Sequence, residues 1–195
     1  LINNKFFNLC IKFFPYISQR TLHIENQIVS PTKNEIPNIV YQTWVSRSIQ
    51  WRLSQEIKKF RNSNKDYSFL TYTHEERDEY MKKYWGDHDI YEIYLNSVFQ
   101  PSKADIWRYC ILFDRGGFYF DIKSGYIGKL SKLNNSNGAI LSYEPFSTQI
   151  LPEKEFLNKV DDFNILLNWG FGFKKNHKLL EMLINNICKY STYFR

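Results

Sequence analysis

The side chains best suited to chemistry lie in residues 103–123, which read KADIWRYCILFDRGGFYFDIK. Asp105 and Arg108 are three positions apart, so on a helix their side chains share one face and can form a carboxylate–guanidinium pair. A preorganised pair of this kind can bind hydroxyl groups. Asp121 follows an aromatic run after two glycines, and a carboxylate at the end of a strand can hold a metal ion or accept hydrogen bonds from a sugar or ribose.

Each of these features also has an ordinary structural interpretation. An Asp-x-x-Arg pair is usually a surface ion pair, two glycines after a helix usually form its C-cap, and an aspartate after a strand is usually a turn residue. All of them occur within the 17 residues from Asp105 to Asp121. That concentration favours a functional site over unrelated structural features.

The local sequence predicts how these residues are positioned. Residues 103–114 are expected to form a helix capped by Ser102, and Gly116-Gly117 to end it and turn the chain. A strand is expected over residues 118–122. Three residues should line the buried face of the helix: Trp107, Cys110 and Ile111.

Hydrophobic patterning predicts further strands and helices around this segment. Residues 165–173 should form a hairpin or two short strands around Gly170 and Gly172. Thr73 and Glu76 have capping-box spacing, so a helix should begin at His74. Strands are expected at 38–44, 67–72 and 139–143, and other helices at 48–60, 91–98 and 177–190. Strands that alternate with helices predict a layered α/β domain.

Composition narrows the class of protein. A chain of 195 residues with 43% hydrophobic and 24% charged residues can form one folded domain, which excludes wholesale disorder. The net charge of +6 suggests an anionic partner such as nucleic acid, acidic lipid or a nucleotide phosphate. Because the lysines are scattered and form no stripe, no nucleic-acid partner is expected.

Cysteine and histidine placement gives no sign of a disulfide framework or a zinc site. The three cysteines, Cys10, Cys110 and Cys188, lie far apart and are expected to be reduced thiols. The chain has no apolar run of the length that a membrane span needs, and its start lacks the features of a secretory signal. We therefore expect a cytoplasmic protein, with peripheral contact at a membrane as the alternative.

One domain with a short N-terminal extension is predicted. Residues 1–34 form an N-terminal extension and connector, and residues 35–195 form the main domain. Within the extension, residues 5–17 suit either a basic-aromatic membrane-surface anchor or a short helix packed on the main domain, and the second is favoured. Two prolines in residues 25–37 are typical of a connector.

The central motif resembles a known family. The order Ala-Asp-x-x-Arg, Leu, then Gly-Gly-x-Tyr-x-Asp-x-Asp is the signature of glycosyltransferases with a DXD sugar-binding region. Initiating α-1,6-mannosyltransferases of the yeast type and bacterial capsule and lipopolysaccharide enzymes are among them, and large clostridial toxins have a similar arrangement. Ile36–Trp44 (IPNIVYQTW) resembles the opening strand of the family and Asn168–Leu180 a later region, so the resemblance covers roughly residues 35–190.

The resemblance implies a GT-A fold, the Rossmann-like fold of nucleotide-diphospho-sugar transferases. It also implies transfer of a hexose from a UDP- or GDP-sugar to a glycan or lipid-linked acceptor, with retention at the anomeric carbon. By motif match, the donor sugar would contact Asp105, Arg108, Tyr119 and Asp121, and the nucleoside pocket would be lined by Gln42, Thr43 and Trp44.

Two departures from the family pattern matter. The third DXD position is Lys123, so only Asp121 remains to bind the expected Mn²⁺ or Mg²⁺, and metal use is in doubt. Lys123 could replace part of the metal's charge at the diphosphate, could point away, or could mark an inactive module that only binds a nucleotide sugar or glycan. The chain also stops at Arg195, earlier than is usual for the family, so a truncated C-terminus is expected.

Overall fold

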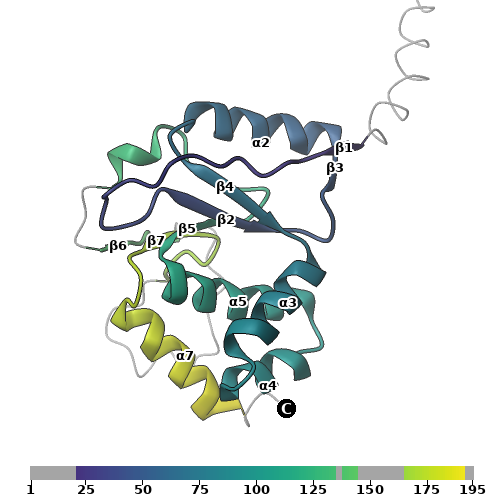
Figure 1. Ribbon diagram of the computed structural model, residues 1–195, viewed down its shortest axis with the longest axis vertical. Helices are drawn as coiled ribbons and strands as arrows, with labels where there is room; N and C mark the ends of the chain where they lie inside the picture. Colours follow the sequence, from purple (N-terminus) through teal and green to yellow (C-terminus); the bar gives the residue numbers. More distant parts are fainter. Residues whose placement is uncertain (1–20, 135–137, 145–164, 192–195) are drawn as a thin grey trace, which may run out of the picture.

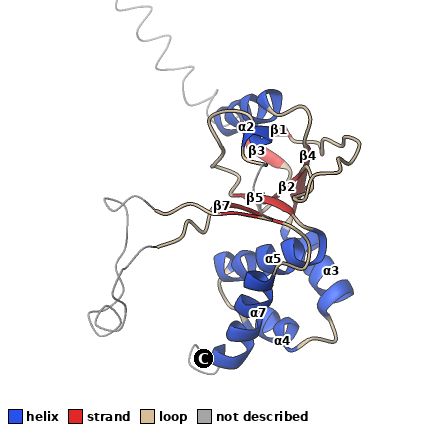
Figure 2. Ribbon diagram, turned by 90° about the vertical axis from the view of Figure 1, so that its left-hand side faces the viewer, coloured by secondary structure: helices blue, strands red, loops and turns tan. Residues whose placement is uncertain are grey.

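The computed structural model describes residues 21–134, 138–144 and 165–191. It is an α/β fold in which a central five-stranded sheet lies between one helix on one face and four helices on the other (Figures 1 and 2). The predicted α/β class is therefore confirmed.

The sheet has the strand order β4-β2-β5-β7-β6. The strands are β2 (Ile39–Thr43), β4 (Ser68–Tyr72), β5 (Gly117–Phe120), β6 (Ala139–Ile140) and β7 (Gly170–Phe173). β2 pairs in parallel with both β4 and β5, whereas β7 is antiparallel to β5 and β6. Because β4, β2 and β5 are parallel neighbours, their carboxyl ends meet at one edge of the sheet, where ligands of α/β sheets bind.

The helices form two unequal layers (Figure 2). Among the described α-helices, only α2 (Trp51–Ser63) covers one face of the sheet. The other face is covered by α3 (His74–Trp85), α4 (Asp89–Asn96), α5 (Gln100–Arg115) and α7 (Lys178–Tyr190). A single turn of 3-10 helix, η1 (Leu130–Lys132), precedes β6. The site-bearing helix α5 thus packs directly beneath the strand β5 that follows it.

Apolar residues on both faces of the sheet form the core. As predicted, Trp107, Cys110 and Ile111 of α5 are fully buried. They pack in one cluster with Tyr119 on β5, and residues such as Phe118 and Phe120 pack in a second cluster on the α2 side. All four residues of β5 are buried, as expected for a strand covered on both faces.

The glycine pair between α5 and β5 behaves as predicted. Gly116 is the C-cap of α5 with φ 65°, a conformation that favours glycine. A Cβ atom there would lie 2.7 Å from the backbone nitrogen of Lys175. The turn therefore needs glycine both for its backbone angle and for close approach, and it fixes where β5 begins.

Three local predictions are wrong. α5 begins at Gln100 and not at 103, since Pro101 suits a first helical turn, and Ser102 lies inside the helix. Residues 48–50 form β3 (Ser48–Gln50), which pairs with β1 (Thr21–His23), so α2 begins at Trp51.

The segment 165–173 contains one named strand and no hairpin of its own. Both glycines lie in β7, where Gly172 faces the ring of Phe118, so a Cβ there would come within 2.7 Å of the ring. β6 ends at Ile140, shorter than predicted, and beyond it Tyr143 forms only an isolated bridge with Leu166.

The N-terminal connector lies against the main domain. β1 pairs with β3, and Gln27 forms an antiparallel bridge with Phe69 at the outer edge of β4. Residues 5–17 lie outside the described residues, and the boundary at residue 34 stays a prediction. Within the described ranges, no helix is long and apolar enough to cross a membrane.

Candidate functional site

A cavity of about 430 Å³ opens at the sheet edge where the parallel strands end. Its lining includes six of the residues that the sequence predicts for the site: Thr43, Trp44, Arg108, Tyr119, Asp121 and Lys123. We call it the donor cavity. Residues far apart in the sequence meet there because β2 and β5 are neighbours in the sheet.

Arg108 is the centre of the polar cluster at this cavity. Its guanidinium is buried, with 5% of the residue exposed, and Nη2 lies 2.6 Å from Oδ1 of Asp105 and 3.6 Å from Oδ1 of Asp121. The guanidinium carbon also lies 4.3 Å from the ring centre of Tyr119. The predicted convergence of the two carboxylates on Arg108 is therefore confirmed.

Asn168, just before β7, supports this cluster. Its backbone carbonyl accepts a hydrogen bond from Nη1 of Arg108, and its Nδ2 donates to Oδ1 of Asp105 over 3.3 Å. Its Oδ1 accepts from the hydroxyl of Tyr109 at 2.8 Å. Sequence reasoning marked Asn168 only as part of a flanking resemblance, because its contacts depend on β7 lying beside β5.

Burial sets the electrostatics of the acidic side chains. Burial raises the pKa of Asp105; Arg108 opposes the shift, and Asp121 adds to it. Tyr119 donates its hydroxyl to Oδ1 of Asp121 at 2.5 Å, and burial raises the pKa of Tyr119 above its usual range. Tyr119 therefore remains a neutral donor that orients the Asp121 carboxylate.

The residues predicted for the nucleoside lie in two places. Thr43 and Trp44 line the donor cavity, whereas the side chain of Gln42 lines a neighbouring cavity of about 410 Å³ on the α2 side. The two cavities share Ile122, Lys123 and Ser124. Gln42 is 1% exposed, and its Oε1 has no hydrogen-bond partner among the described residues, so this oxygen is available to a donor from a ligand.

Lys123 lies at the border of the two cavities. Its residue is exposed, and Nζ lies 5.2 Å from the ring centre of Trp44. Lys123 therefore lies on the walls of both cavities, and its role toward a diphosphate stays a prediction.

The described residues do not fit the paired carboxylates of a DXD metal site. Asp121 is the only acidic side chain among the described residues that line the donor cavity, and one of its oxygens already accepts from Tyr119. Across the described ranges, no group of three or more His, Cys, Asp or Glu side chains could hold a metal ion. Dependence on Mn²⁺ or Mg²⁺ stays a prediction, with Asp121 as the one residue assigned to it.

Among the lining residues that sequence reasoning missed are His74, Arg77 and Gln100. His74 and Arg77 are three apart on α3, so they share one face. The predicted capping box gave a signal for both, because it places the first turn of α3 at the carboxyl end of β4.

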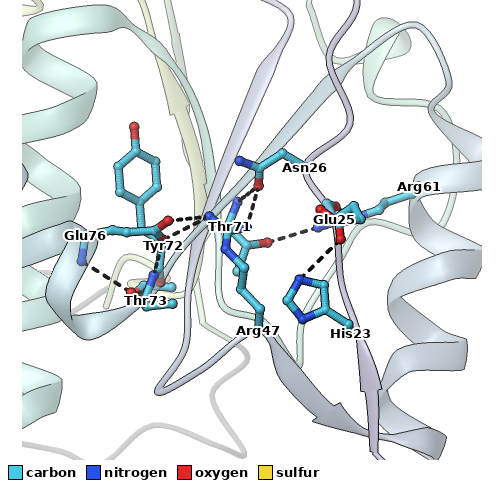
Figure 3. Close-up of polar contacts among 10 residues, drawn as sticks. His23, Glu25, Asn26, Arg47, Arg61, Thr71, Tyr72, Thr73 and Glu76 are labelled. Atoms are coloured by element: carbon cyan, nitrogen blue, oxygen red, sulfur yellow. Dashed lines mark hydrogen bonds and ion pairs between the residues drawn. The ribbon is translucent and has the colours of Figure 1, made fainter.

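That capping box is confirmed and is part of a larger network (Figure 3). Thr73 Oγ1 accepts from the backbone nitrogen of Glu76 at 3.2 Å, and Glu76 Oε2 accepts from that of Thr73 at 2.8 Å. Glu76 also accepts two hydrogen bonds from Nη2 of Arg47, at 2.7 and 2.9 Å. This network holds the start of α3 beside the donor cavity.

Comparison with known proteins matches the region of the chain that contains this site. The family described as glycosyltransferase sugar-binding region containing DXD motif matches residues 50–140, which include Asp105, Arg108 and Asp121. The chain is 23% identical over 167 residues to inositol phosphoceramide mannosyltransferase 3 of Schizosaccharomyces pombe, covering 85% of this chain and 41% of that protein. It is 30% identical over 109 residues to mannosyl phosphorylinositol ceramide synthase SUR1 of Saccharomyces cerevisiae, covering 55% and 28% respectively.

A solved structure has the same fold. The PaToxG glycosyltransferase aligns with a TM-score of 0.58 at 14% identity, over 98% of this chain and 69% of that one. The fold is therefore GT-A-like, and the matched region is similar to the sugar-binding region of glycosyltransferases. The chain spans less than half of the length of the curated relatives named above.

Proposed function

We propose that this chain carries the donor site of a hexosyltransferase that uses a nucleotide-diphosphate sugar. One observation carries the proposal: Asp105 and Asp121 converge on Arg108, and Arg108 and Asp121 line the cavity at the carboxyl ends of the parallel strands. A guanidinium held between two carboxylates fixes the carboxylates in place, and carboxylate oxygens are good acceptors for sugar hydroxyls.

The proposed donor lies across both cavities. Asp105 and Asp121 accept hydrogen bonds from the sugar, Tyr119 lies beside it, and Arg108 holds both carboxylates in place. Trp44 borders the base, Thr43 lines the same pocket, and the unpaired Oε1 of Gln42 accepts from an N–H or O–H group of the nucleoside. Lys123, at the border of the cavities, contacts the diphosphate, and the donor is a UDP- or GDP-sugar.

The proposed reaction breaks the bond between the anomeric carbon and the diphosphate oxygen, and the leaving nucleotide keeps the electron pair. The acceptor hydroxyl forms the new glycosidic bond and passes its proton to the leaving diphosphate, with retention at the anomeric carbon. Positive charge near the leaving group and carboxylates near an oxocarbenium-like sugar stabilise the transition state. We assign no catalytic nucleophile to any residue.

The names of the relatives support the acceptor class, since one is an inositol phosphoceramide mannosyltransferase and the other a mannosyl phosphorylinositol ceramide synthase. We propose mannose as the transferred hexose and a glycolipid or related glycan as the acceptor. Peripheral contact with a membrane through residues 5–17 belongs to the same proposal.

Nucleotide release from a panel of UDP- and GDP-sugars, with Mn²⁺ or with EDTA, tests the proposal. We expect Asp105→Ala and Asp121→Ala to lower the rate by about a hundredfold or more, the scale of losing one positioned polar group. Asp87→Ala, an exposed position in the turn before α4, is the control and should leave the rate unchanged. Full activity of both site variants would refute the assignment, and donor binding without release would support the inactive module.

A further inference from the structure

Arg77 is a buried cation that lacks an anionic partner. The residue is 1% exposed and lines the donor cavity. Its direct partners are neutral, because Nε donates to the hydroxyl of Tyr94 at 3.1 Å and Nη2 donates to Oε1 of Gln100. The Tyr94 hydroxyl donates in turn to Oδ1 of Asp78, so the one carboxylate in this chain of contacts reaches Arg77 only through a neutral group. Within the described ranges, no acidic side chain comes within the ion-pair distance of 4.0 Å. A buried charge of this kind is costly unless an anion compensates it.

Two other buried arginines show why Arg77 is different. Arg108 already has Asp105 and Asp121 beside it. Arg61 donates to the backbone oxygen of Glu25 and to Oγ1 of Thr71, and it is not among the residues that line the donor cavity. Arg77 alone of the three combines the lack of a carboxylate with a position on the cavity wall.

Lys123 adds a second uncompensated cation to the same cavity. No described carboxylate pairs with it, and its contact is with the ring of Trp44. The described lining carries three cations, Arg77, Arg108 and Lys123, against the single carboxylate of Asp121, a formal charge of +2. Including Asp105, which pairs with Arg108, still leaves +1. A cavity with this excess attracts an anion.

We propose that Arg77 and Lys123 together bind the phosphate groups of the ligand in the donor cavity, and that no divalent cation is needed for this binding. The identity of the ligand as a nucleoside diphosphate rests on the proposed function, whereas the anion site rests on the cavity alone. The planar guanidinium of Arg77 suits phosphate oxygens, and the ammonium of Lys123 supplies a point charge.

This site explains the mismatch at the DXD motif. A metal bridge needs carboxylate ligands, and the described lining of the cavity offers only Asp121, with Lys123 in the position of the second acid. Two fixed cations would supply the charge that stabilises the departing diphosphate. Arg77 thereby becomes a phosphate-binding residue that neither the central motif nor its flanks indicate.

Calorimetry of inorganic pyrophosphate binding to the full chain, at low salt in EDTA, tests the anion site. We expect the wild-type chain to bind, and Arg77→Met to weaken binding by about thirtyfold or more, as for removal of one partner of a buried charge pair. Arg77→Lys, which keeps the charge, should retain part of the affinity. Lys82→Ala, which removes an exposed lysine from the same helix, is the control and should bind like the wild type.

Variants of Lys123 keep the test valid if Arg77→Met fails to fold, because Lys123 is exposed. Lys123→Ala should weaken binding by about tenfold, less than the loss of Arg77, because water screens an exposed charge. Lys123→Asp recreates the Asp-x-Asp spacing, so binding in EDTA should be lost and Mn²⁺ should restore it. Wild-type binding only with Mn²⁺, or equal affinity in all variants in EDTA, would overturn the proposal.

Competition separates the possible sources of the phosphate. UDP or GDP should displace pyrophosphate if the site holds the donor diphosphate, and failure of both to compete overturns that assignment. Pyrophosphate binding without nucleotide release from any sugar donor would leave the anion site standing and refute the proposed transferase. Nucleotide release that requires Mn²⁺ and is unchanged in Arg77→Lys and Lys123→Ala would leave the transferase standing and refute this site.

Discussion

Two charged regions flank the start of α3, and their charges are arranged in opposite ways. In the network of Figure 3, Arg47 donates twice to Glu76 and once to Oδ1 of Asn26 at 3.0 Å, so its charge is compensated by the protein itself. In the donor cavity, Arg77 and Lys123 have no described carboxylate partner. The cation of the first region has a carboxylate partner within the protein, whereas two cations of the second region lack a direct one among the described residues.

The comparison shows how one region supports the other. Glu76 closes the first turn of α3 and joins it to Arg47, which fixes the helix that carries Arg77. Arg77 lies one position after Glu76 in the first turn of α3. Glu76 pairs with Arg47, whereas Arg77 lines the donor cavity. Substitutions in the network should therefore change mainly stability, and substitutions in the cavity mainly ligand binding and turnover.

The largest effect is expected for Arg108→Met. The substitution leaves Asp105 and Asp121 without the cation between them, so the two carboxylates repel each other and lose their orientation. Nucleotide release should fall by about a thousandfold, the upper scale for loss of one preorganised charged group in an active site. Steady-state release assays measure it, with thermal melting to show that the variant folds.

Arg108→Lys is the matched control for charge. A lysine keeps one positive charge but not the planar fork that reaches Asp105, Asp121 and the carbonyl of Asn168 together, so it should rescue folding more than activity. Wild-type rates of nucleotide release in both variants would show that substitutions in the donor cavity do not affect turnover more than substitutions in the Arg47 network.

The second effect is one of stability. Glu76→Ala removes the carboxylate of the capping box and the partner of Arg47, and we expect a loss of about 1–2 kcal/mol in the free energy of unfolding. Urea denaturation measures it, with Glu79→Ala, an exposed acid on the same helix, as control. An unchanged midpoint in Glu76→Ala, or an equal loss in Glu79→Ala, would show that this network does not stabilise the helix start.

Local patterns account for the parts of the site that the sequence predicts. The spacing of Asp105 and Arg108, the two glycines of the turn and the capping box of α3 each depend on residues within one helical turn or one chain reversal. Such features can be recognised from the local sequence alone. The parallel pairing of β2 with β5 then brings Thr43 and Trp44 to the same cavity.

Contacts between distant segments account for what the sequence did not predict. Arg77 reaches the cavity because it is held by Tyr94 and Gln100, which are 17 and 23 positions away. Arg108 contacts Asn168 across 60 positions. Such long-range partners follow no periodic pattern in the sequence. The glycines of β7 suggested a hairpin for the same reason, because the rings that require glycine there belong to the neighbouring strand β5.

The third effect is a pH dependence at Asp105, which pairs with Arg108 of the cavity wall. Burial raises the pKa of Asp105, so its carboxylate takes up a proton at a higher pH than an ordinary aspartate. If the donor sugar needs the ionised form, nucleotide release should decline as the pH falls through this raised pKa. Carboxyl NMR shifts and the rate profile should change over the same pH interval, and titration of Asp105 below the usual aspartate range would contradict the prediction.

The smallest effect is the acid dependence of the network. Burial alone would raise the pKa of Glu76, but hydrogen bonds from Arg47 and Thr73 outweigh it and hold the pKa below its usual value. A carboxyl with a lowered folded-state pKa stabilises the fold above its unfolded pKa, and that contribution is lost as the pH falls through the folded value. Because the side chain of Glu76 is 40% exposed, solvent screening should keep the contribution below about 1 kcal/mol.

Comparing unfolding free energies of the wild type and Glu76→Gln between neutral pH and the acid range measures this dependence. The glutamine variant keeps the size of the side chain but does not titrate, so the stability gap between the two proteins should narrow as the pH falls below the normal glutamate range. A gap that stays constant, while Asp105 titrates as expected, would mean that the Arg47 network is held by hydrogen bonds alone. The contrast between a compensated network and an uncompensated cavity would then rest on geometry and not on charge.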